Sequence, residues 1–292
     1  MTPGRREDQQ AESPKVAPDR RREARRGIGV FLVALVVLSA PAMVFAVVAR
    51  NDIGILVLMW APGLAALATR LMLREGFGDI SLRLGRRSGW ALLIALGYPV
   101  GIATAAYGLG WASGLAHFTS PAGTSSGWGS FAGELLVGTV LGTAVGLVFA
   151  LGEELGWRGY LLTRLIDAGV PRPLMVSGLI WAAWHLPLII GGSYLTGNGG
   201  SMPVIAVLFV VQVTVVSYVF ARLRLDTGSI WPAVLLHASW NSVIQSVFDP
   251  HTSGSQAWLW LGEQGVLTLA ANVIGAVILC RRPGRVLRQP PT

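Results

Sequence analysis

The sequence predicts an all-α, polytopic membrane helix bundle with about eight transmembrane helices and both termini in the cytoplasm. Its 292 residues are 52% hydrophobic and 13% charged, with a mean hydropathy of +0.57, whereas about a quarter of the residues in soluble domains are charged. Apolar stretches of about 20 residues recur along the chain, each long enough to cross the hydrocarbon core as a helix. Helices are expected because a lipid environment offers backbone amides no other partner, and a β-barrel would need short alternating segments.

The order and orientation of the expected spans follow from hydropathy and from the basic residues. The basic residues lie in the N-terminal segment 1–26, at the ends of the even-numbered spans and after the last span, and Arg50 is the exception. The positive-inside rule therefore places these ends and both termini in the cytoplasm. The expected spans cover roughly 28–49, 53–73, 89–111, 131–151, 174–190, 203–221, 229–248 and 258–280.

The chain divides into three expected regions. Residues 1–26 form a basic tail that is expected to be disordered, 27–281 form the transmembrane bundle, and 282–292 form a short cytoplasmic tail. The net charge of +8 is spread over the cytoplasmic ends, which argues against a nucleic-acid partner and favours contact with anionic membrane lipid. We expect a multi-pass protein of the cell membrane, and the sequence leaves its oligomeric state open. The single cysteine, Cys280, excludes an internal disulfide or a cysteine cluster.

Ionisable side chains that the expected helices place within the membrane include Glu153, Glu154, His185 and His237, because the fourth helix is expected to continue past 151 to about Leu162. A charged group at mid-bilayer costs at least about 3 kcal/mol, so such residues indicate a functional site. At 1.5 Å per residue, Glu153, His185 and His237 lie roughly 14, 16 and 12 Å from the cytoplasmic ends of three different helices. Their common depth predicts one shared site that opens toward the cytoplasm.

Three further ionisable residues lie near the opposite interface. Glu134 begins the fourth expected span, and His117 and His251 lie in the outer loops. We expect all three to be solvated surface residues.

Spacing separates the two adjacent glutamates. Glu154 and Arg158 are four residues apart, an arrangement that favours an ion pair on one helix face. Glu153 points about 100° away from Glu154 and is expected to remain free as a general base. The alternative is that all three residues form only a structural ion network.

Two more pairs have the same i,i+4 spacing. His237 and Asn241, in the stretch HASWN, share a helix face and can contact the same ligand atom, although a helix–helix hydrogen bond explains this pair about as well. Trp181 and His185, in WAAWH, allow the indole to stack on the imidazole and fix its rotamer. Ordinary packing is the alternative for this second pair.

Together, EELGWR (153–158), WAAWH (181–185) and HASWN (237–241) resemble the three motifs of the CPBP family of intramembrane proteases. This family, also called Abi, contains the type II CAAX prenyl endopeptidases and their bacterial relatives, among them bacteriocin-processing proteins. Its motifs are E-E-x-x-x-R, F-x-x-x-H and H-x-x-x-N/D on three transmembrane helices. The resemblance covers about 131–248, and Trp181 departs from it by replacing the usual Phe.

The resemblance implies an intramembrane endopeptidase that cleaves a membrane-associated or lipid-modified protein or peptide. That substrate would enter from the membrane or from the cytoplasmic side. Glu153 and His185 would activate water, while His237 and Asn241 would stabilise the oxyanion, roles that suit a carboxylate, imidazoles and an amide in a dry site. The supporting motif residues would be Glu154, Arg158 and Trp181.

The need for a cofactor stays open. Glu153, His185 and His237 could form a two-histidine, one-carboxylate site for zinc or another divalent metal, but the sequence lacks an H-E-x-x-H motif. Asn241 fits an oxyanion role better than a ligand role, so we expect catalysis without a metal.

Two other functions compete with proteolysis. The first is a transporter that moves protons or ions, which would be favoured by internal symmetry; the halves 28–151 and 174–280 show none. The second is a catalytically silent immunity or scaffold protein, which altered motifs would favour. Every motif residue proposed for chemistry is present.

Overall fold

The structure, a computed structural model, describes residues 18–50, 52–85, 88–121, 127–195 and 200–281. Most of these residues are helical, and the strands among them are β1 (His117–Phe118) and β2 (Thr252–Ser253), which pair antiparallel. Three helical segments, η1 to η3, have π geometry. The helical elements are α1 (Pro18–Ala49), α2 (Asp52–Leu58), α3 (Ala61–Leu73), α4 (Ser88–Ala112), α5 (Trp128–Val137), η1 (Gly138–Gly142), α6 (Thr143–Gly156), η2 (Trp157–Leu161), α7 (Leu162–Asp167), α8 (Pro173–Ile190), α9 (Met202–Thr227), α10 (Trp231–Trp240), η3 (Asn241–Phe248), α11 (Ala257–Trp260) and α12 (Val266–Cys280).

The architecture confirms the expected all-α polytopic membrane bundle. Six helical stretches in the described ranges are long and apolar enough to cross a membrane, and they correspond to the first six expected spans. The fourth is a continuous helix of 40 residues that runs through α5, η1, α6, η2 and α7. The six stretches are Asp19–Ala49, Ile53–Leu73, Ser88–Ala112, Trp128–Asp167, Pro173–Ile190 and Met202–Thr227.

The seventh and eighth expected spans differ from these six. The seventh corresponds to α10 and η3, whose hydropathy is lowered by polar side chains that include His237 and Asn241. The eighth is not one helix over 258–280, because α11 ends at Trp260 and α12 begins only at Val266. Gly262 adopts a positive φ of 79° in the intervening turn, which is a conformation that suits glycine.

The N-terminal region also differs from the expectation. Helix α1 begins at Pro18, within the segment 1–26 that was expected to be disordered. Proline at the start of a helix and Asp19 in its first turn are both favourable there. Residues 1–17 and the expected tail 282–292 lie outside the described residues.

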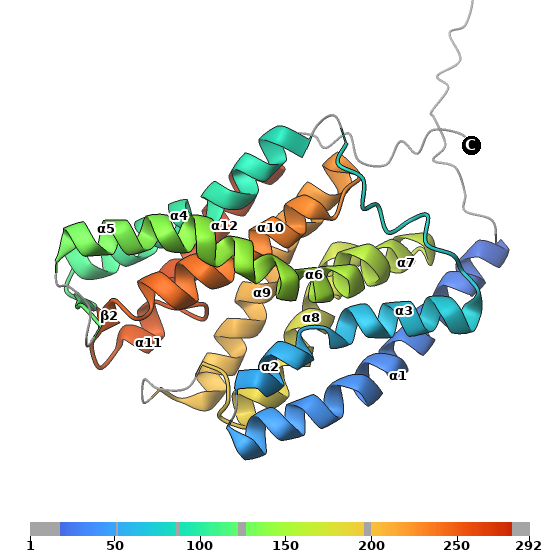
Figure 1. Ribbon diagram of the computed structural model, residues 1–292, viewed down its shortest axis with the longest axis horizontal. Helices are drawn as coiled ribbons and strands as arrows, with labels where there is room; N and C mark the ends of the chain where they lie inside the picture. Colours follow the sequence, from blue (N-terminus) through green and yellow to red (C-terminus); the bar gives the residue numbers. More distant parts are fainter. Residues whose placement is uncertain (1–17, 51, 86–87, 122–126, 196–199, 282–292) are drawn as a thin grey trace, which may run out of the picture.

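The long helix through α5, α6 and α7 runs across the bundle, with other helices on both sides of it (Figure 1). Helices α1 and α3 lie side by side, and α3 packs against α6. Helix α10 contacts α6 from another direction and also contacts α4 and α9, while α8 packs along α9. Helix α9 therefore connects α8 to α10, and α10 contacts α6 directly.

Glycines allow α6 to approach the start of α3 very closely. A Cβ atom added to Gly156 would lie 2.6 Å from backbone atoms of Pro62, and one added to Gly152 would lie 2.7 Å from the carbonyl oxygen of Met59. Small residues commonly permit such close contacts between membrane helices. This contact fixes the end of α6 that carries the two motif glutamates.

We therefore expect Gly156→Ala to destabilise the protein by about 1–3 kcal/mol, because overpacking forces backbone to move. Gly97→Ala in α4 is the matched control, since no heavy atom of the described residues lies within 4 Å of its added Cβ. The control should be as stable as the parent or slightly more stable. Thermal unfolding in detergent measures both variants, and equal melting temperatures would contradict the proposed tight contact.

A partly buried ion cluster ties the C-terminal end of α3 to the long helix. Arg70 forms an ion pair with Asp79 and donates a 3.2 Å hydrogen bond to the carbonyl oxygen of Gly159 in η2. Arg164 pairs with Glu75 and Asp79 at 2.8 Å. Burial would raise the pKa of Asp79, but the two arginines outweigh that effect and hold its pKa below the ordinary value. The arginines at this end thus help to hold α3 against the long helix.

Candidate active site

Two π-helical segments lie directly beside the motif residues. Glu153 and Glu154 occupy the last turn of α6, immediately before η2, and Asn241 is the first residue of η3. Single π turns within α-helices are frequent at functional sites. They change the direction in which the following side chains point, so Arg158 in η2 follows a locally widened turn.

The carboxylate of Glu153 is buried, with 2% of the residue exposed. Its Oε2 atom accepts hydrogen bonds from the indole Nε1 atoms of Trp157 at 3.0 Å and Trp181 at 2.9 Å. Its Oε1 atom lies 3.8 Å from Nε2 of His237. One oxygen is therefore fixed by two donors, and the other faces the imidazole.

Glu154 is fully buried and contacts two other motif residues through one oxygen. Its Oε1 atom accepts hydrogen bonds from Nη1 of Arg158 and from Nδ1 of His237, both at 2.9 Å. The guanidinium of Arg158 lies between the rings of Trp181 and Phe220, 4.2 and 4.3 Å from their centroids. The expected Glu154–Arg158 pair is present. The contact with His237 was not predicted because the two residues lie 83 positions apart in the sequence, on different helices.

His185 is anchored by backbone rather than by the expected aromatic stacking. Its Nδ1–H donates a 2.9 Å hydrogen bond to the carbonyl oxygen of Trp181, which leaves Nε2 without the proton in the neutral ring. The Trp181 ring lies edge-on at 6.0 Å, so ordinary packing, and not stacking, describes this pair. Tyr194 is the ring that lies roughly parallel to His185, at 5.8 Å.

Asn241 is oriented by a chain of hydrogen bonds that ends at a carboxylate. Its Oδ1 accepts a 3.4 Å hydrogen bond from Gln245, whose amide also donates to the hydroxyl of Tyr194 at 3.1 Å. Tyr194 in turn donates a short hydrogen bond to Glu263, and Trp240 donates to the other oxygen of Glu263 at 2.6 Å. This arrangement leaves the NH₂ group of Asn241 available as a donor.

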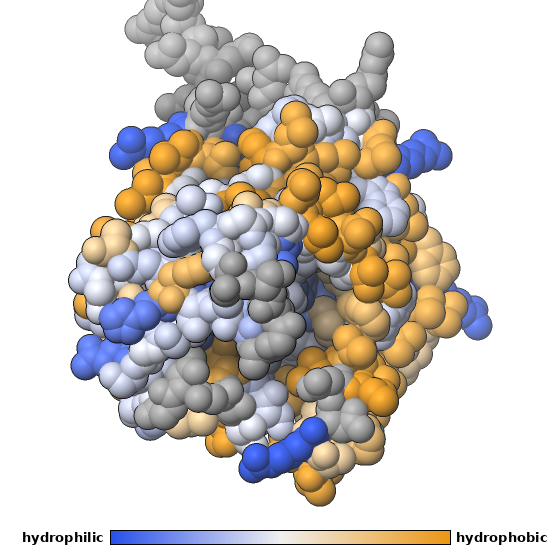
Figure 2. Space-filling model, turned by 60° about the vertical axis from the view of Figure 1, so that its left-hand side comes forward, coloured by the Kyte–Doolittle hydropathy of each residue, from blue (hydrophilic) through white to orange (hydrophobic). Residues whose placement is uncertain are grey.

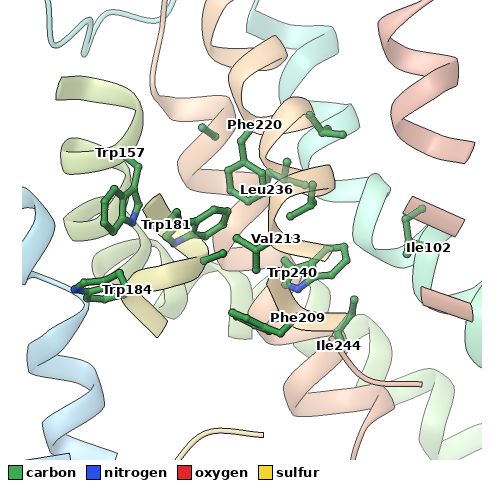
Figure 3. Packing of buried hydrophobic residues seen from close by; sticks show 14 of the residues in the cluster. Ile102, Trp157, Trp181, Trp184, Phe209, Val213, Phe220, Leu236, Trp240 and Ile244 are labelled. Carbon is green, nitrogen blue, oxygen red and sulfur yellow. The ribbon is translucent and has the colours of Figure 1, made fainter. Parts of the chain in front are cut away.

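A cavity of about 90 Å³ brings the four residues predicted to be catalytic together. Glu153, His185, His237 and Asn241 all line it, although they come from α6, α8, α10 and η3. Figure 3 shows part of the aromatic and aliphatic packing around this region. The apolar part of the lining includes Leu58, Trp184, Leu188, Phe209, Val213 and Phe220.

Residues 134–243 match the family model described as "Type II CAAX prenyl endopeptidase Rce1-like". This segment is similar to the Rce1-like family. The match contains all three motifs and confirms the resemblance to the CAAX protease family. It supports a membrane-embedded, multi-pass endopeptidase. No curated protein matches the chain.

Three polar side chains outside the predicted site residues also line the cavity. Tyr194, Gln245 and Glu263 line it, and they lie toward the end of the bundle that is opposite the arginine-rich ends of α3 and α7. Figure 2 shows the side of the molecule where α5, β2 and α11 lie in Figure 1, and this face is hollowed near its middle. The lining thus extends beyond the motif residues, and the cytoplasmic opening of the cavity stays a prediction.

The sequence analysis missed three residues of the cavity wall that lie outside the three motifs: Tyr194, Gln245 and Glu263. Glu263 follows residue 243, where the Rce1-like match ends. A signal for it existed, because Glu263 is a carboxylate inside the expected eighth span, 258–280. Its burial, with 6% of the residue exposed, agrees with the rule that such residues indicate function.

The candidate metal ligands of this site are partly engaged by other residues. Across the described ranges, no three His, Cys, Asp or Glu side chains are grouped as metal ligands. Glu153 Oε2 is occupied by two indole donors, and Nδ1 of His237 is occupied by Glu154. The proposed zinc ligands Glu153, His185 and His237 share a cavity without forming a metal-binding cluster.

The expectation for the outer residues holds only in part. His117 is exposed and Glu134 is partly exposed. His251, however, is buried, so its prediction as a surface residue is wrong. Its ring packs against Phe118 and Phe131, with centroids 5.8 and 5.0 Å away, and its Nε2 lies 3.6 Å from Glu134. The aromatic cluster at this end of the bundle encloses it.

Proposed function

We propose that this protein is a metal-independent intramembrane endopeptidase. Its substrate would be a membrane-associated or lipid-modified protein or peptide in the cell membrane. The observation that carries the proposal is the convergence of Glu153, His185, His237 and Asn241 on one largely apolar cavity. A transporter or a silent scaffold gives no reason for this combination of a carboxylate, two imidazoles and an amide.

Glu153 is the general base in this proposal. Trp157 and Trp181 fix its Oε2 atom, so Oε1 is the atom that accepts a proton from water. Nε2 of His185 is the second acceptor on the same cavity, and it holds the water in place for attack on the carbonyl carbon. Proton acceptors positioned within hydrogen-bond reach of water contribute about 10²–10⁴-fold to the rate.

His237 and Asn241 stabilise the developing oxyanion. Glu154 orients the imidazole of His237 through Nδ1, so that Nε2, when it carries a proton, can donate to the oxyanion. Gln245 holds Oδ1 of Asn241, so its NH₂ group is the second donor. Fixed donors in a dry site are usually the largest single contribution to such catalysis. The proton on Glu153 then passes to the leaving amine.

The substrate enters from the membrane in this proposal. Apolar and aromatic side chains make up most of the cavity wall, which suits an apolar peptide or a lipid-modified one. The cytoplasmic route is less favoured because the polar lining residues Tyr194, Gln245 and Glu263 lie toward the other end of the bundle.

The test is hydrolysis of defined peptides by the purified protein in lipid nanodiscs. One probe is an internally quenched, farnesylated peptide with a CAAX ending, and the other is an unmodified apolar peptide. We expect cleavage of at least one probe, with an unchanged rate after chelator treatment. Loss of activity with chelator and its recovery with zinc would support the metal-dependent alternative. No cleavage, together with proton or ion flux in liposomes, would support the transporter.

The hydrogen-bond chain behind Asn241 gives a further prediction. Tyr194→Phe removes the hydroxyl that links Gln245 to Glu263, so Asn241 should be less well oriented. We expect kcat to fall several-fold to about tenfold, consistent with the loss of roughly one neutral hydrogen bond, with little change in KM. Steady-state kinetics on the cleaved probe measures this. A change confined to KM would contradict a role in orienting the oxyanion donor.

A further inference from the structure

Gln212 is a buried polar residue that the proposed mechanism does not use. It lies near the middle of α9, an otherwise apolar membrane helix, and only 1% of the residue is exposed. Neither its Nε2 nor its Oε1 atom has a hydrogen-bond partner within the part of the chain that the structure describes. Buried amides without partners are costly and therefore rare in folded proteins.

The side chain of Gln212 belongs to the wall of the catalytic cavity. Its neighbours from α9 in that wall are apolar and include Phe209, Val213 and Val216. Helix α9 carries none of the residues to which we assign catalysis, but it packs along α8, which carries His185. Gln212 is thus a single polar group on an apolar surface that shares the cavity with Glu153.

The chemistry of Gln212 indicates what it can bind. Its amide offers both a donor and an acceptor, and both atoms are unpaired. An aliphatic or prenyl chain satisfies neither atom, and a carboxylate or phosphate offers only acceptors. One residue of an extended peptide presents its N–H and C=O on the same side, as in a hydrogen-bonded pair of an antiparallel ladder.

We propose that Gln212 hydrogen-bonds the backbone N–H and C=O of one extended substrate residue close to the scissile bond. The proposal rests on the proposed peptidase function. It assigns α9 the task of holding the peptide against the side chains of α6, α8 and α10. Because the contact is to backbone, it selects an extended conformation without selecting a particular side chain.

Binding can be measured without turnover in the Glu153→Gln background. The probes are fluorescent versions of the farnesylated CAAX peptide and the unmodified apolar peptide, and fluorescence anisotropy in nanodiscs gives Kd. Adding Gln212→Met, a substitution of similar size, should raise Kd about tenfold, as expected for the loss of one to two buried hydrogen bonds. Its melting temperature should be unchanged or higher, since the substitution removes an unpaired amide.

Ser217→Ala is the matched control. Ser217 lies on the same helix, is equally buried and has an unpaired hydroxyl among the described residues, but it is not part of the cavity wall. This control should leave Kd and hydrolysis unchanged. If Gln212→Met leaves Kd unchanged, or if it lowers the melting temperature as expected for a structural amide, the proposal is overturned.

A peptide series locates the contact and separates this inference from the proposed function. Replacing each backbone N–H in turn by an ester oxygen should identify one position that weakens binding to the Gln212 protein. The same ester should have no further effect on the Gln212→Met protein. If the parent protein cleaves neither probe but Gln212→Met still weakens binding, the proposed peptidase function fails and the inference about Gln212 stands. If the parent cleaves a probe and Gln212→Met leaves Kd and KM unchanged, the proposed peptidase function stands and the inference about Gln212 fails.

Discussion

Glu153→Gln should abolish peptide hydrolysis and leave the fold intact. Glutamine has the same size, and its carbonyl oxygen can accept the two indole hydrogen bonds that now reach Oε2. Its NH₂ group would then occupy the place of Oε1 and could not accept a proton from water. Loss of the general base should lower kcat by at least about 10²–10⁴-fold. Kinetics and thermal unfolding on the same preparation measure both effects.

Glu134→Gln is the matched control for that variant. Glu134 lies on the same long helix, is partly exposed and is not part of the cavity wall. Its substitution should leave the hydrolysis rate unchanged. An active Glu153→Gln variant would show that this carboxylate is not the base.

Glu154→Gln should reduce both stability and activity. The substitution removes the countercharge of Arg158, which is buried between two aromatic rings, and breaking a buried ion pair typically costs about 3–5 kcal/mol. It also removes the anionic partner of His237. The sequence assigned Glu154 only to Arg158, and the contact with His237 is what adds the expected loss of activity.

The double variant Glu154→Gln/Arg158→Gln separates the two effects. Removing the unpaired guanidinium should recover part of the lost stability, while activity should stay low because His237 still lacks its carboxylate partner. Melting temperatures and rates per folded molecule of the parent, both single variants and the double variant form a complete cycle. Full recovery of activity in the double variant would contradict a role for Glu154 in orienting His237. A stable but inactive Glu154→Gln beside an active Glu153→Gln would show that the two roles are inverted.

Much of the fold and of the site could be predicted from local sequence. An apolar segment in lipid must satisfy its own backbone hydrogen bonds, and it therefore forms a helix. For this reason hydropathy predicted the first six spans correctly. Helical spacing predicts contacts within one helix, which explains why the pair of Glu154 and Arg158 was expected. Depth along the helices was enough to suggest that Glu153, His185 and His237 share a cavity.

Contacts between distant segments could not be predicted in the same way. The Glu154–His237 hydrogen bond depends on how α6 and α10 rotate about their axes. The links from Asn241 to Glu263 depend on the break between α11 and α12, where hydropathy alone suggested one continuous span. His251 looks like a loop residue in sequence, and its burial arises from aromatic rings contributed by other elements.

The most direct test of the central claim is the identity of the reaction products in H₂¹⁸O. Parent protein and Glu153→Gln are incubated in nanodiscs with each quenched peptide, and mass spectrometry identifies the fragments. Water activated by Glu153 predicts two complementary fragments from the parent protein. One ¹⁸O atom should appear in the newly formed carboxyl group, and Glu153→Gln should produce no fragments above background. The absence of fragments with the parent protein, or equal rates of cleavage by Glu153→Gln, would contradict the claim.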